Sequence, residues 1–303
     1  MDERDYIMLH YIYEEKNITR AAERLYTSQP SLTYRIQQIE KNLGIQVLVR
    51  NGKSLEFTPE GEYLASFARQ MLGHLRNFHD HLANIKSQVQ GTLRIASTSI
   101  TARYYLPKVL KEFSTMYPHI HINVDTGKSG DVIQALENEE VHVGIVRGEF
   151  DWPEQKHLIS RENICLIAKE EIDLSLLPQM HRIFHRSSKS THKTKHYDTM
   201  SEKILTWWNE RFSTPPIFSM QVGSYEACKE MVINGLGYAI IPRNFIKPDD
   251  DLYVQELVLK NGEVLYRNSW LLFRESCLEL LFVRKFVEYI QSLPCHQDMP
   301  VHQ

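Results

Sequence analysis

A long apolar repeat, with a helix-start signal before it and a helix-breaking glycine after it, restricts the fold of this chain more than any other feature. From Leu64 to Val89, apolar residues recur at alternating steps of four and three residues without a slip. This spacing is typical of a helix that pairs with another helix along one face. Thr58 and Pro59 can begin such a helix, and Gly91 can end it. We therefore expect a helix over 59–90 that divides the chain in two.

The repeat is a candidate dimerisation seam. A helix of about 30 residues is about 45 Å long, which exceeds the span of a small domain. An amphipathic helix packed against its own chain would show the same pattern, and this alternative stays open. We favour pairing between two chains, as in a coiled coil. The seam residues are Leu64, Ala68, Met71, Leu75, Phe78, Leu82, Ile85 and Val89.

Three shorter helices are expected before the seam. Helical spacing of apolar residues predicts the first over 6–13. Asn17 or Thr19 can cap the second, and the third can run from a Ser28 cap to Gly44. Two short helices joined by a tight turn, the second with a polar first turn, form a helix-turn-helix. This motif places its second helix in the major groove of DNA.

A short hairpin is predicted directly after these helices. Residues 47–50 and 55–58 are apolar segments, and the Asn-Gly step in the 51–54 connection favours a tight turn between two strands. Such a hairpin would form the wing of a winged helix-turn-helix. Its cations, Arg50 and Lys53, would then meet phosphates or the minor groove beside the recognition helix.

The charge distribution supports a DNA-binding role for this region. The chain has a net charge of −3 at pH 7, but residues 16–61 contain seven Lys or Arg and four acids. Nucleic-acid binding requires a basic face rather than a basic total. Any single charge on a helix is usually only solvated, so the interpretation depends on the whole set. The candidate DNA contacts are Thr19, Arg20, Ser28, Gln29, Pro30, Ser31, Thr33, Tyr34, Arg35, Arg50 and Lys53.

The rest of the chain has a different pattern, in which apolar strands alternate with helices. This alternation predicts a parallel sheet with crossover helices, in two units as in two-lobed solute-binding folds. We expect strands at 92–96, 120–125, 141–146, 164–168, 217–222, 238–241 and 268–273, and helices at 103–116, 129–138, 200–212, 225–234 and 277–292. The overall class is α/β. The expected boundaries are 1–58 for the winged helix-turn-helix, 59–90 for the linker helix and 91–303 for the two-lobed domain, with lobe I at about 91–161 and 267–303 and lobe II at about 162–266.

Ligands of such folds bind at the carboxyl ends of strands, where helix N-termini offer free N–H groups to anions. Hydroxyl groups and two cations, Lys128 and Arg147, follow the expected strand ends, which suits a small anion. Any one of these Ser or Thr residues could equally be a helix cap. The candidate ligand contacts are Ser97, Thr98, Ser99, Thr101, Gly127, Lys128, Ser129, Arg147, Gly223 and Ser224.

The chain resembles the LysR-type transcriptional regulators. In the N-terminal part, the resemblance rests on residues 18–25, 28–33, 39–40, 43–44, Arg50 and 58–61. In the C-terminal part it rests on looser motifs at 106–107, Phe113, 117–118, Gly127, 144–146, 234–237 and 241–242. The departures are Thr33 where the family usually has Ser, Leu48 for Phe, Glu139 for Gly and His142 for Asp.

The resemblance implies a sequence-specific, DNA-binding regulator of transcription whose activity responds to a small metabolite between two lobes. It also implies linker helices that pair, usually within tetramers, so a homodimer or homotetramer is expected. Paired DNA-binding heads predict an operator with an inverted repeat. RNA polymerase is a further candidate partner.

Other classes fit less well. A solute-binding protein of a transporter would explain only residues 92–303, and the charged start 1–5 leads into no signal peptide or membrane anchor, so a cytoplasmic protein without a membrane partner is expected. Neither Gly-x-Ser-x-Gly nor Gly-x-Gly-x-x-Gly occurs, and we find no paired-carboxylate signature, which argues against an enzyme. No cofactor or metal is expected, since the four cysteines are widely spaced and the histidines His181, His185, His192 and His196 alternate with Arg and Lys.

Overall fold

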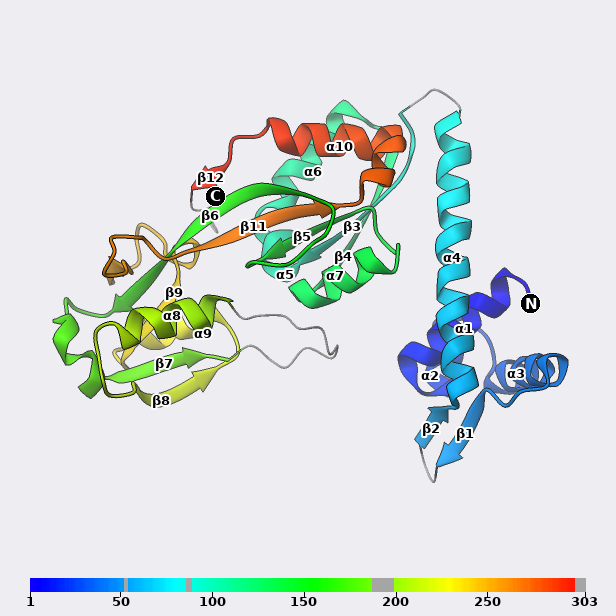
Figure 1. Ribbon diagram of the computed structural model, residues 1–303, viewed down its shortest axis with the longest axis horizontal. Coiled ribbons are helices and arrows are strands. Elements are labelled where there is room, and N and C mark those ends of the chain that lie inside the picture. The colour runs from blue at the N-terminus through cyan, green and yellow to red at the C-terminus, as the bar shows by residue number, and fades with distance from the viewer. Residues whose placement is uncertain (52–53, 86–88, 187–198, 298–303) are drawn as a thin grey trace. The chain divides into compact units, whose positions relative to one another are not determined.

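The computed structural model describes residues 1–51, 54–85, 89–186 and 199–297 (Figure 1). The chain divides into two compact units: Met1–Ser87 with Asn138–Glu140, and Gln88–Glu137 with Val141–Gln303. Within the described residues, no helix has the length and apolar character that are needed to cross a membrane.

The first unit is a winged helix-turn-helix followed by a long helix (Figure 1). Its elements are α1 (Glu3–Glu15), α2 (Ile18–Arg24), α3 (Gln29–Leu43), β1 (Leu48–Asn51), β2 (Ser54–Phe57) and α4 (Pro59–Ile85). β1 and β2 pair antiparallel, which forms the predicted hairpin. The buried residues of this unit come from every helix: Met8, Leu9, Ile12, Ala21, Ala22, Leu32, Ile36, Ile39, Val47, Leu64 and Ala68.

Local chemistry fixes the ends of α3 and the start of α4. Ser28 caps α3 by accepting from the Ser31 N–H, and Gly44 ends α3 with a φ of 67°, which glycine adopts easily. The Thr58 hydroxyl accepts from the Gly61 N–H at 2.9 Å. A Cβ on Gly61 would lie 2.1 Å from the Val47 carbonyl oxygen. Glycine is therefore required where α4 leaves the wing.

The second unit contains a mixed sheet flanked by helices (Figure 1). Its strands are β3 (Gly91–Thr98), β4 (Ile120–Gly127), β5 (Val143–Arg147), β6 (Gln155–Ala168), β7 (His181–His185), β8 (Ile217–Val222), β9 (Tyr238–Pro242), β10 (Tyr253–Glu256), β11 (Tyr266–Phe273) and β12 (His296–Gln297). Its helices are α5 (Ser99–Tyr104), α6 (Leu106–Met116), α7 (Ser129–Glu137), η1 (Leu174–Gln179), α8 (Thr199–Asn209), α9 (Tyr225–Ile233), η2 (Arg243–Phe245), η3 (Glu275–Glu279) and α10 (Leu281–Ser292).

These strands form one network in the order β4-β3-β5-β11-β6-β9-β7-β8, with β10 and β12 also paired to β6. We call β3–β5, β11, the first part of β6 and their helices lobe I, and the second part of β6, β7–β10 and their helices lobe II. Each lobe has its own apolar core, around Phe113, Phe282 and Phe286 in lobe I and around Trp207, Trp208 and Tyr238 in lobe II. The single strand β6 contributes to both.

The sheet differs from the expected parallel arrangement. β3 pairs parallel with β4 and β5, as expected, and β7, a strand that was not expected, pairs parallel with β8 and β9. β11 and β10, however, run antiparallel to β6, and β9 does as well. The sheet is mixed because β6 and β11 carry the chain out of lobe I and back into it.

One helix prediction and one seam residue need correction. The expected helix 103–116 is divided at Tyr105 into α5 and α6, because Pro107 has no N–H to continue an earlier helix. α4 is described as far as Ile85, and residues 86–88, where the predicted helix would continue, lie outside the described residues. Val89 lies outside the helix and packs against the core of lobe I, so it does not belong to the seam.

Candidate DNA-binding surface and effector site

The first turns of α3 present most of the residues that are expected to meet DNA. Pro30, Ser31 and Tyr34 are exposed, whereas Gln29 and Thr33 are half-buried. The Gln29 side-chain nitrogen donates to the Thr33 hydroxyl at 3.1 Å, and that hydroxyl donates to the Gln29 carbonyl oxygen at 3.0 Å. These two bonds orient the Gln29 carboxamide before any DNA is bound.

Arg35 is engaged within the protein. Its guanidinium donates to both carboxylate oxygens of Asp5 in α1, with Nη2 3.0 Å from Oδ2, and Nη2 also donates to Asp2 at 3.1 Å. Burial alone would raise the pKa of Asp5, but bonds from Arg35 and the Asp2 N–H together hold that pKa below its ordinary value. Arg35 therefore ties α3 to α1, a role that the sequence alone did not indicate.

Other residues on this side of the domain were missed. Tyr26, in the turn between α2 and α3, is 98% exposed and has a φ of 51°, a left-handed conformation that is costly for a tyrosine. Gln37 and Lys41 are exposed further along α3. Their helical spacing from Tyr34 could have identified them, because residues three, four and seven apart share a face.

The remaining DNA-contact candidates lie on α2 and the wing. Thr19 and Arg20 are exposed in the first turn of α2, where their backbone N–H groups bond the side chain of the Asn17 cap. Asn17 is thus the cap, rather than Thr19. Arg50 lies in β1, but its side chain is outside the described part, as is Lys53.

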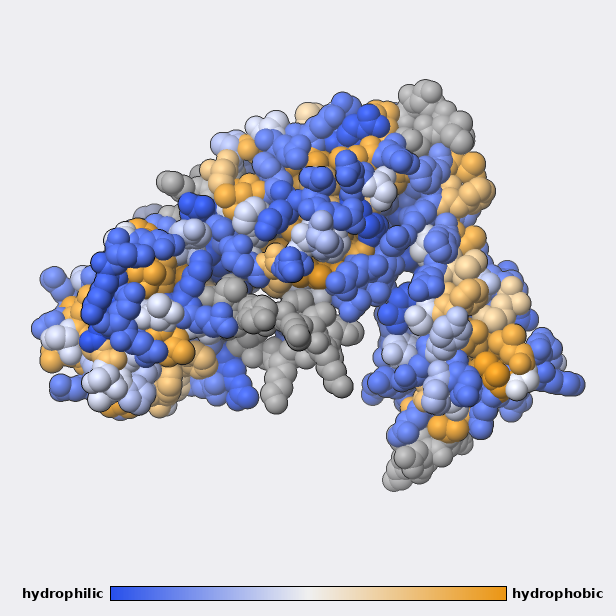
Figure 2. All heavy atoms as spheres, viewed as in Figure 1, coloured by the Kyte–Doolittle hydropathy of each residue, from blue (hydrophilic) through white to orange (hydrophobic). Residues whose placement is uncertain are grey.

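The seam on α4 is only partly free for a partner. Leu64 and Ala68 are buried in the core of the first unit, which corrects their assignment to a seam between chains. Met71 and Leu75 are half-buried, while Phe78 is 57% and Leu82 45% exposed. Figure 2 shows apolar residues at the surface along α4. The Ile85 side chain is outside the described part.

The expected effector residues of lobe I lie at one edge of its sheet. Thr98 pairs with Gly127 at the ends of β3 and β4, and Ser97 pairs with Ile145, two residues before Arg147 at the end of β5. Parallel strands thus bring Ser97, Thr98, Gly127 and Arg147 to the same carboxyl edge, as the sequence predicts. Gly223 and Ser224 follow β8 in lobe II, at the corresponding edge of its parallel strands.

Several hydroxyl groups at this edge already have structural roles. Ser129 bonds the backbone N–H and carbonyl oxygen of Arg147, both at 3.2 Å, and Ser224 caps α9. The hydroxyls of buried Thr98 and Thr101 lie 2.8 Å apart. Ser99 is exposed, and the Lys128 N–H bonds Asp131 at 2.9 Å. Ser224 therefore serves as a helix cap, which is one of the two roles that the sequence allowed.

Arg147 is the most unusual group in the second unit. It is 3% exposed and forms an ion pair with Glu162, which is 1% exposed. Its Nε and Nη1 atoms are buried without a hydrogen-bond partner among the described atoms. Burial lowers the pKa of Arg147, and the charge of Glu162 opposes that shift. The guanidinium also lies 5.8 Å from the ring centroid of Phe245 in η2, so it faces lobe II.

A polar row crosses the strands that connect the lobes. Ser269 in β11 pairs with Arg147 on one side and with Ser160 on the other, and Arg267 pairs with Glu162. The hydroxyls of Ser160 and Ser269 are buried without a partner among the described atoms. Arg147 and Arg267 carry two positive charges and Glu162 carries one negative charge, so this row has a net positive charge. The sequence did not reveal it, because only the strand pairing brings these residues together.

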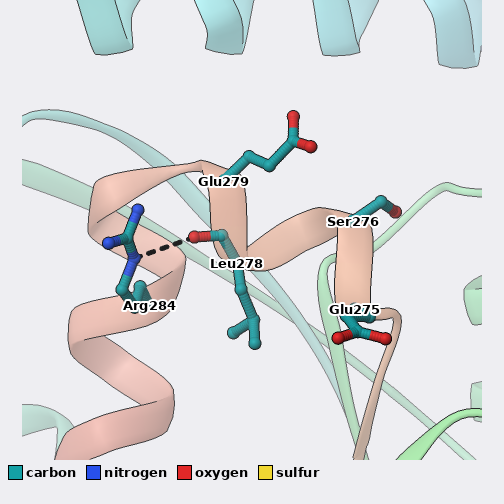
Figure 3. Close-up of a pocket in the computed structure, with 5 residues that line it drawn as sticks. All are labelled: Glu275, Ser276, Leu278, Glu279 and Arg284. Atoms are coloured by element: carbon teal, nitrogen blue, oxygen red, sulfur yellow. Dashed lines mark hydrogen bonds between the residues drawn. The ribbon is translucent and has the colours of Figure 1, made fainter.

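A hollow lies on the surface of lobe I next to η3, which follows the end of β11. It is lined by Glu275, Ser276, Leu278 and Glu279 of η3 and by Arg284 of α10, whose Nε donates to the Leu278 carbonyl oxygen at 2.9 Å (Figure 3). None of the expected effector residues lines it.

The structure bears on the metal prediction only in part. His181 and His185 lie in β7, whereas His192 and His196 are outside the described residues. Among the residues that the structure describes, no group of three or more His, Cys, Asp or Glu is placed to hold a metal ion.

Family models match both parts of the chain. The bacterial regulatory helix-turn-helix protein, lysR family, matches residues 4–62, and the LysR substrate binding domain matches residues 86–294.

Whole-chain relatives agree with these matches. The HTH-type transcriptional regulators YraN and YkuM of Bacillus subtilis are 39% and 32% identical, over 96% and 94% of this chain and 98% and 95% of their own. The LysR family regulator CbnR has a similar fold, with a TM-score of 0.64 at 20% identity over 96% of this chain and 98% of its own. CbnR has also been crystallised with its target DNA; that structure has a TM-score of 0.62 at 21% identity and covers 96% and 99% of the two chains. This chain therefore belongs to the LysR family and is a DNA-binding transcriptional regulator with a LysR substrate binding domain.

Proposed function

We propose that this regulator binds an inverted-repeat operator in double-stranded DNA through paired winged helix-turn-helix domains. We further propose that a small anionic metabolite, bound between lobes I and II, changes its activity. We assign residues 1–58 to the winged helix-turn-helix, 59–90 to the linker helix and 91–303 to the two-lobed domain. Because its ligand is DNA, we expect the protein to act in the cytoplasm. As a regulator of transcription, it is also expected to contact RNA polymerase.

The exposed first turns of α3 carry the DNA proposal. Gln29, Ser31, Thr33 and Tyr34 offer amide and hydroxyl groups that can bond base edges or phosphates. Arg20 on α2 and Arg50 in the wing lie in elements that flank α3 and would bind phosphates. We assign Arg35 to the support of α3, because Asp5 and Asp2 already occupy its guanidinium.

The oligomer proposal rests on the free part of the α4 stripe. Phe67, Met71, Leu75, Phe78 and Leu82 follow helical spacing on one side of α4, and Phe67, Phe78 and Leu82 are exposed. An exposed apolar stripe of this length is typical of a helix that pairs with a second copy. Pairing of two such helices would hold two DNA-binding heads, and a second pairing would give a homotetramer.

The effector proposal rests on Arg147. A buried guanidinium with two unpartnered nitrogen atoms is costly unless an anion or water joins it. Glu162 neutralises one charge, but Arg267 pairs opposite Glu162 and restores a positive balance. A carboxylate that enters from the carboxyl edge of β3, β4 and β5 would meet Arg147 and the Thr98 and Thr101 hydroxyls.

The DNA proposal is tested by Gln29→Ala. This change should cost about 1–3 kcal/mol of affinity for the specific operator in a fluorescence anisotropy titration. Non-specific affinity and thermal stability should be unchanged. Gln291→Ala, an exposed glutamine on α10, is the matched control and should bind operator normally. Unchanged operator affinity in Gln29→Ala would show that the recognition helix is wrongly assigned.

A further inference from the structure

Lobe II contains a buried cation, Arg182, that has no anionic partner among the described residues. Arg182, the second residue of β7, is 6% exposed. It has neither an ion pair nor a hydrogen bond among the described residues, and its Nε is completely buried. Burial lowers the pKa of Arg182, and the groups that act against this shift are Tyr238 and Cys228 rather than a carboxylate. An isolated buried charge is costly, so a neutralising group is expected there.

The two neighbouring groups that act on the pKa of Arg182, Cys228 and Tyr238, do not supply that negative charge. Burial raises the pKa of Cys228 to about 11 and the pKa of Tyr238 to about 12. Both groups are therefore neutral near pH 7, and the tyrosine hydroxyl is a donor. Arg147 in lobe I provides the contrast, since it is equally buried but has Glu162 as its counterion.

A second orphan donor lies beside Arg182. Tyr238 is fully buried, and its hydroxyl has no partner among the described atoms. Tyr238 is directly opposite Arg182 in the β7–β9 register, so the two side chains share one face of the sheet. Buried donors almost always have acceptors. One acceptor between the Tyr238 hydroxyl and Arg182 Nε would satisfy both.

Two aromatic rings lie near the guanidinium. Arg182 Cζ lies 5.9 Å from the ring centroid of Phe184 and 5.7 Å from that of Phe218. The two rings meet edge to face, with centroids 5.3 Å apart. Phe218 is also opposite Arg182 in the β7–β8 register and is 56% exposed. The row Tyr238–Arg182–Phe218 therefore runs from the core of lobe II to its surface.

This cluster is separate from the effector site. Arg182 and Tyr238 lie at the amino-terminal ends of β7 and β9. Ser224 follows the carboxyl end of β8, which is parallel to β7. The two locations are thus at opposite edges of the lobe II sheet.

We propose that lobe II holds a second ligand site, in which Arg182 and Tyr238 bind the carboxylate of a small monocarboxylic acid whose apolar body packs on Phe184 and Phe218. One carboxylate balances the single guanidinium and accepts from both donors. The row Tyr238–Arg182–Phe218 contains one cation, so the charge expected of the ligand is that of a monoanion. This proposal does not depend on the effector site around Arg147.

The test is a thermal-shift titration of the full chain with phenylacetate. Acetate, which lacks the ring, and 2-phenylethanol, which lacks the charge, are the matched ligands. Phenylacetate should raise the melting temperature most, since it alone satisfies both halves of the site. Arg182→Met should weaken phenylacetate binding by about tenfold or more. Thr101→Ala, at the effector edge, should leave it unchanged.

Tyr238→Phe provides a variant that keeps the packing of the core. It should fold normally and bind phenylacetate more weakly than the wild type, because one donor to the carboxylate is lost. An absent shift in the wild-type chain would mean that no carboxylate binds to Arg182 and Tyr238, and it would overturn the proposal. A shift that survives in Arg182→Met but is lost in Thr101→Ala would overturn it as well, and would place the carboxylate at the effector edge.

Discussion

Arg35 in α3 donates hydrogen bonds to both carboxylate oxygens of Asp5 in α1, and Asp5 is only 3% exposed. The Asp5 carboxylate also accepts from the Asp2 N–H at 2.9 Å, within the capping box of α1. One buried carboxylate thus joins the first turn of the chain to the middle of the recognition helix. Protonation of Asp5 would remove the charge that Arg35 pairs with in this link between α1 and α3.

Asp5→Asn should therefore have a pH-dependent effect. The pKa of Asp5 is lowered in the folded protein, so its stabilising contribution is present above its ordinary value of 3.8 and is lost as the pH falls through the lowered pKa. Asp5→Asn should lower the melting temperature at pH 7 and have a smaller effect at the lowest pH at which the chain stays folded. Circular dichroism melts at both pH values measure this.

Asp2→Asn is the matched control for this experiment. Asp2 also contacts Arg35, but it is 59% exposed, and asparagine retains its capping oxygen. Its effect should be small at either pH. An equal loss in Asp5→Asn at both pH values would mean that the ion pair with Arg35 does not stabilise the fold.

Tyr26→Gly should separate stability from DNA binding. Glycine adopts the observed φ of 51° without strain, so the free energy of unfolding should stay unchanged or rise by up to about 1 kcal/mol. Operator affinity should fall, because a fully exposed ring beside α3 is lost. Lys16→Gly, at another left-handed position, controls for relief of strain alone. If Tyr26→Gly binds the operator as tightly as the wild type, Tyr26 has no role in DNA binding.

Glu162→Gln should destabilise the second unit strongly. The change leaves Arg147 buried without a counterion, which typically costs about 3–5 kcal/mol. The double change Arg147→Met with Glu162→Leu removes both charges and should recover most of this loss. Urea denaturation compares the three proteins. If the double variant is as unstable as Glu162→Gln, the loss of stability is caused by altered packing rather than by the unpaired charge.

Leu75→Glu combined with Phe78→Glu should abolish pairing through α4, because each chain would place two acids in the apolar stripe. Analytical ultracentrifugation should show a smaller species. Ser66→Glu with Gln70→Glu adds the same charge at exposed polar positions of the same helix and should not alter the mass. An unchanged sedimentation profile in the first variant would contradict pairing along this stripe.

Features that depend on neighbouring residues were predictable from the sequence. Ser28, Pro30 and Gly44 fix the ends of α3 through caps and φ preferences, and both ends lie where the sequence places them. β8 also has the expected bounds, 217–222. In each case the signal lies within a few residues of the feature.

Features that depend on distant pairing were not predictable. The first part of β6 was missed, because its partners in β11 are far along the chain and its residues alternate poorly. β7 was not predicted as a strand, because its histidines and arginine suggested a solvated surface. The Arg147–Glu162 pair and the Arg182–Tyr238 neighbours arise only from strand register. The spacing of residues in the sequence does not indicate either pair.

The continuity of β6 limits how the ligand-binding half can move. At the crossing from lobe I to lobe II, Asn163 still pairs with β11, and Ile164 already pairs with β9. The lobes are therefore joined there by hydrogen-bonded strands instead of a loop. Any rotation of one lobe against the other must be absorbed as torsion along this strand pair. The regulatory signal should therefore travel between the lobes as a change in the twist of β6 and its partner strands.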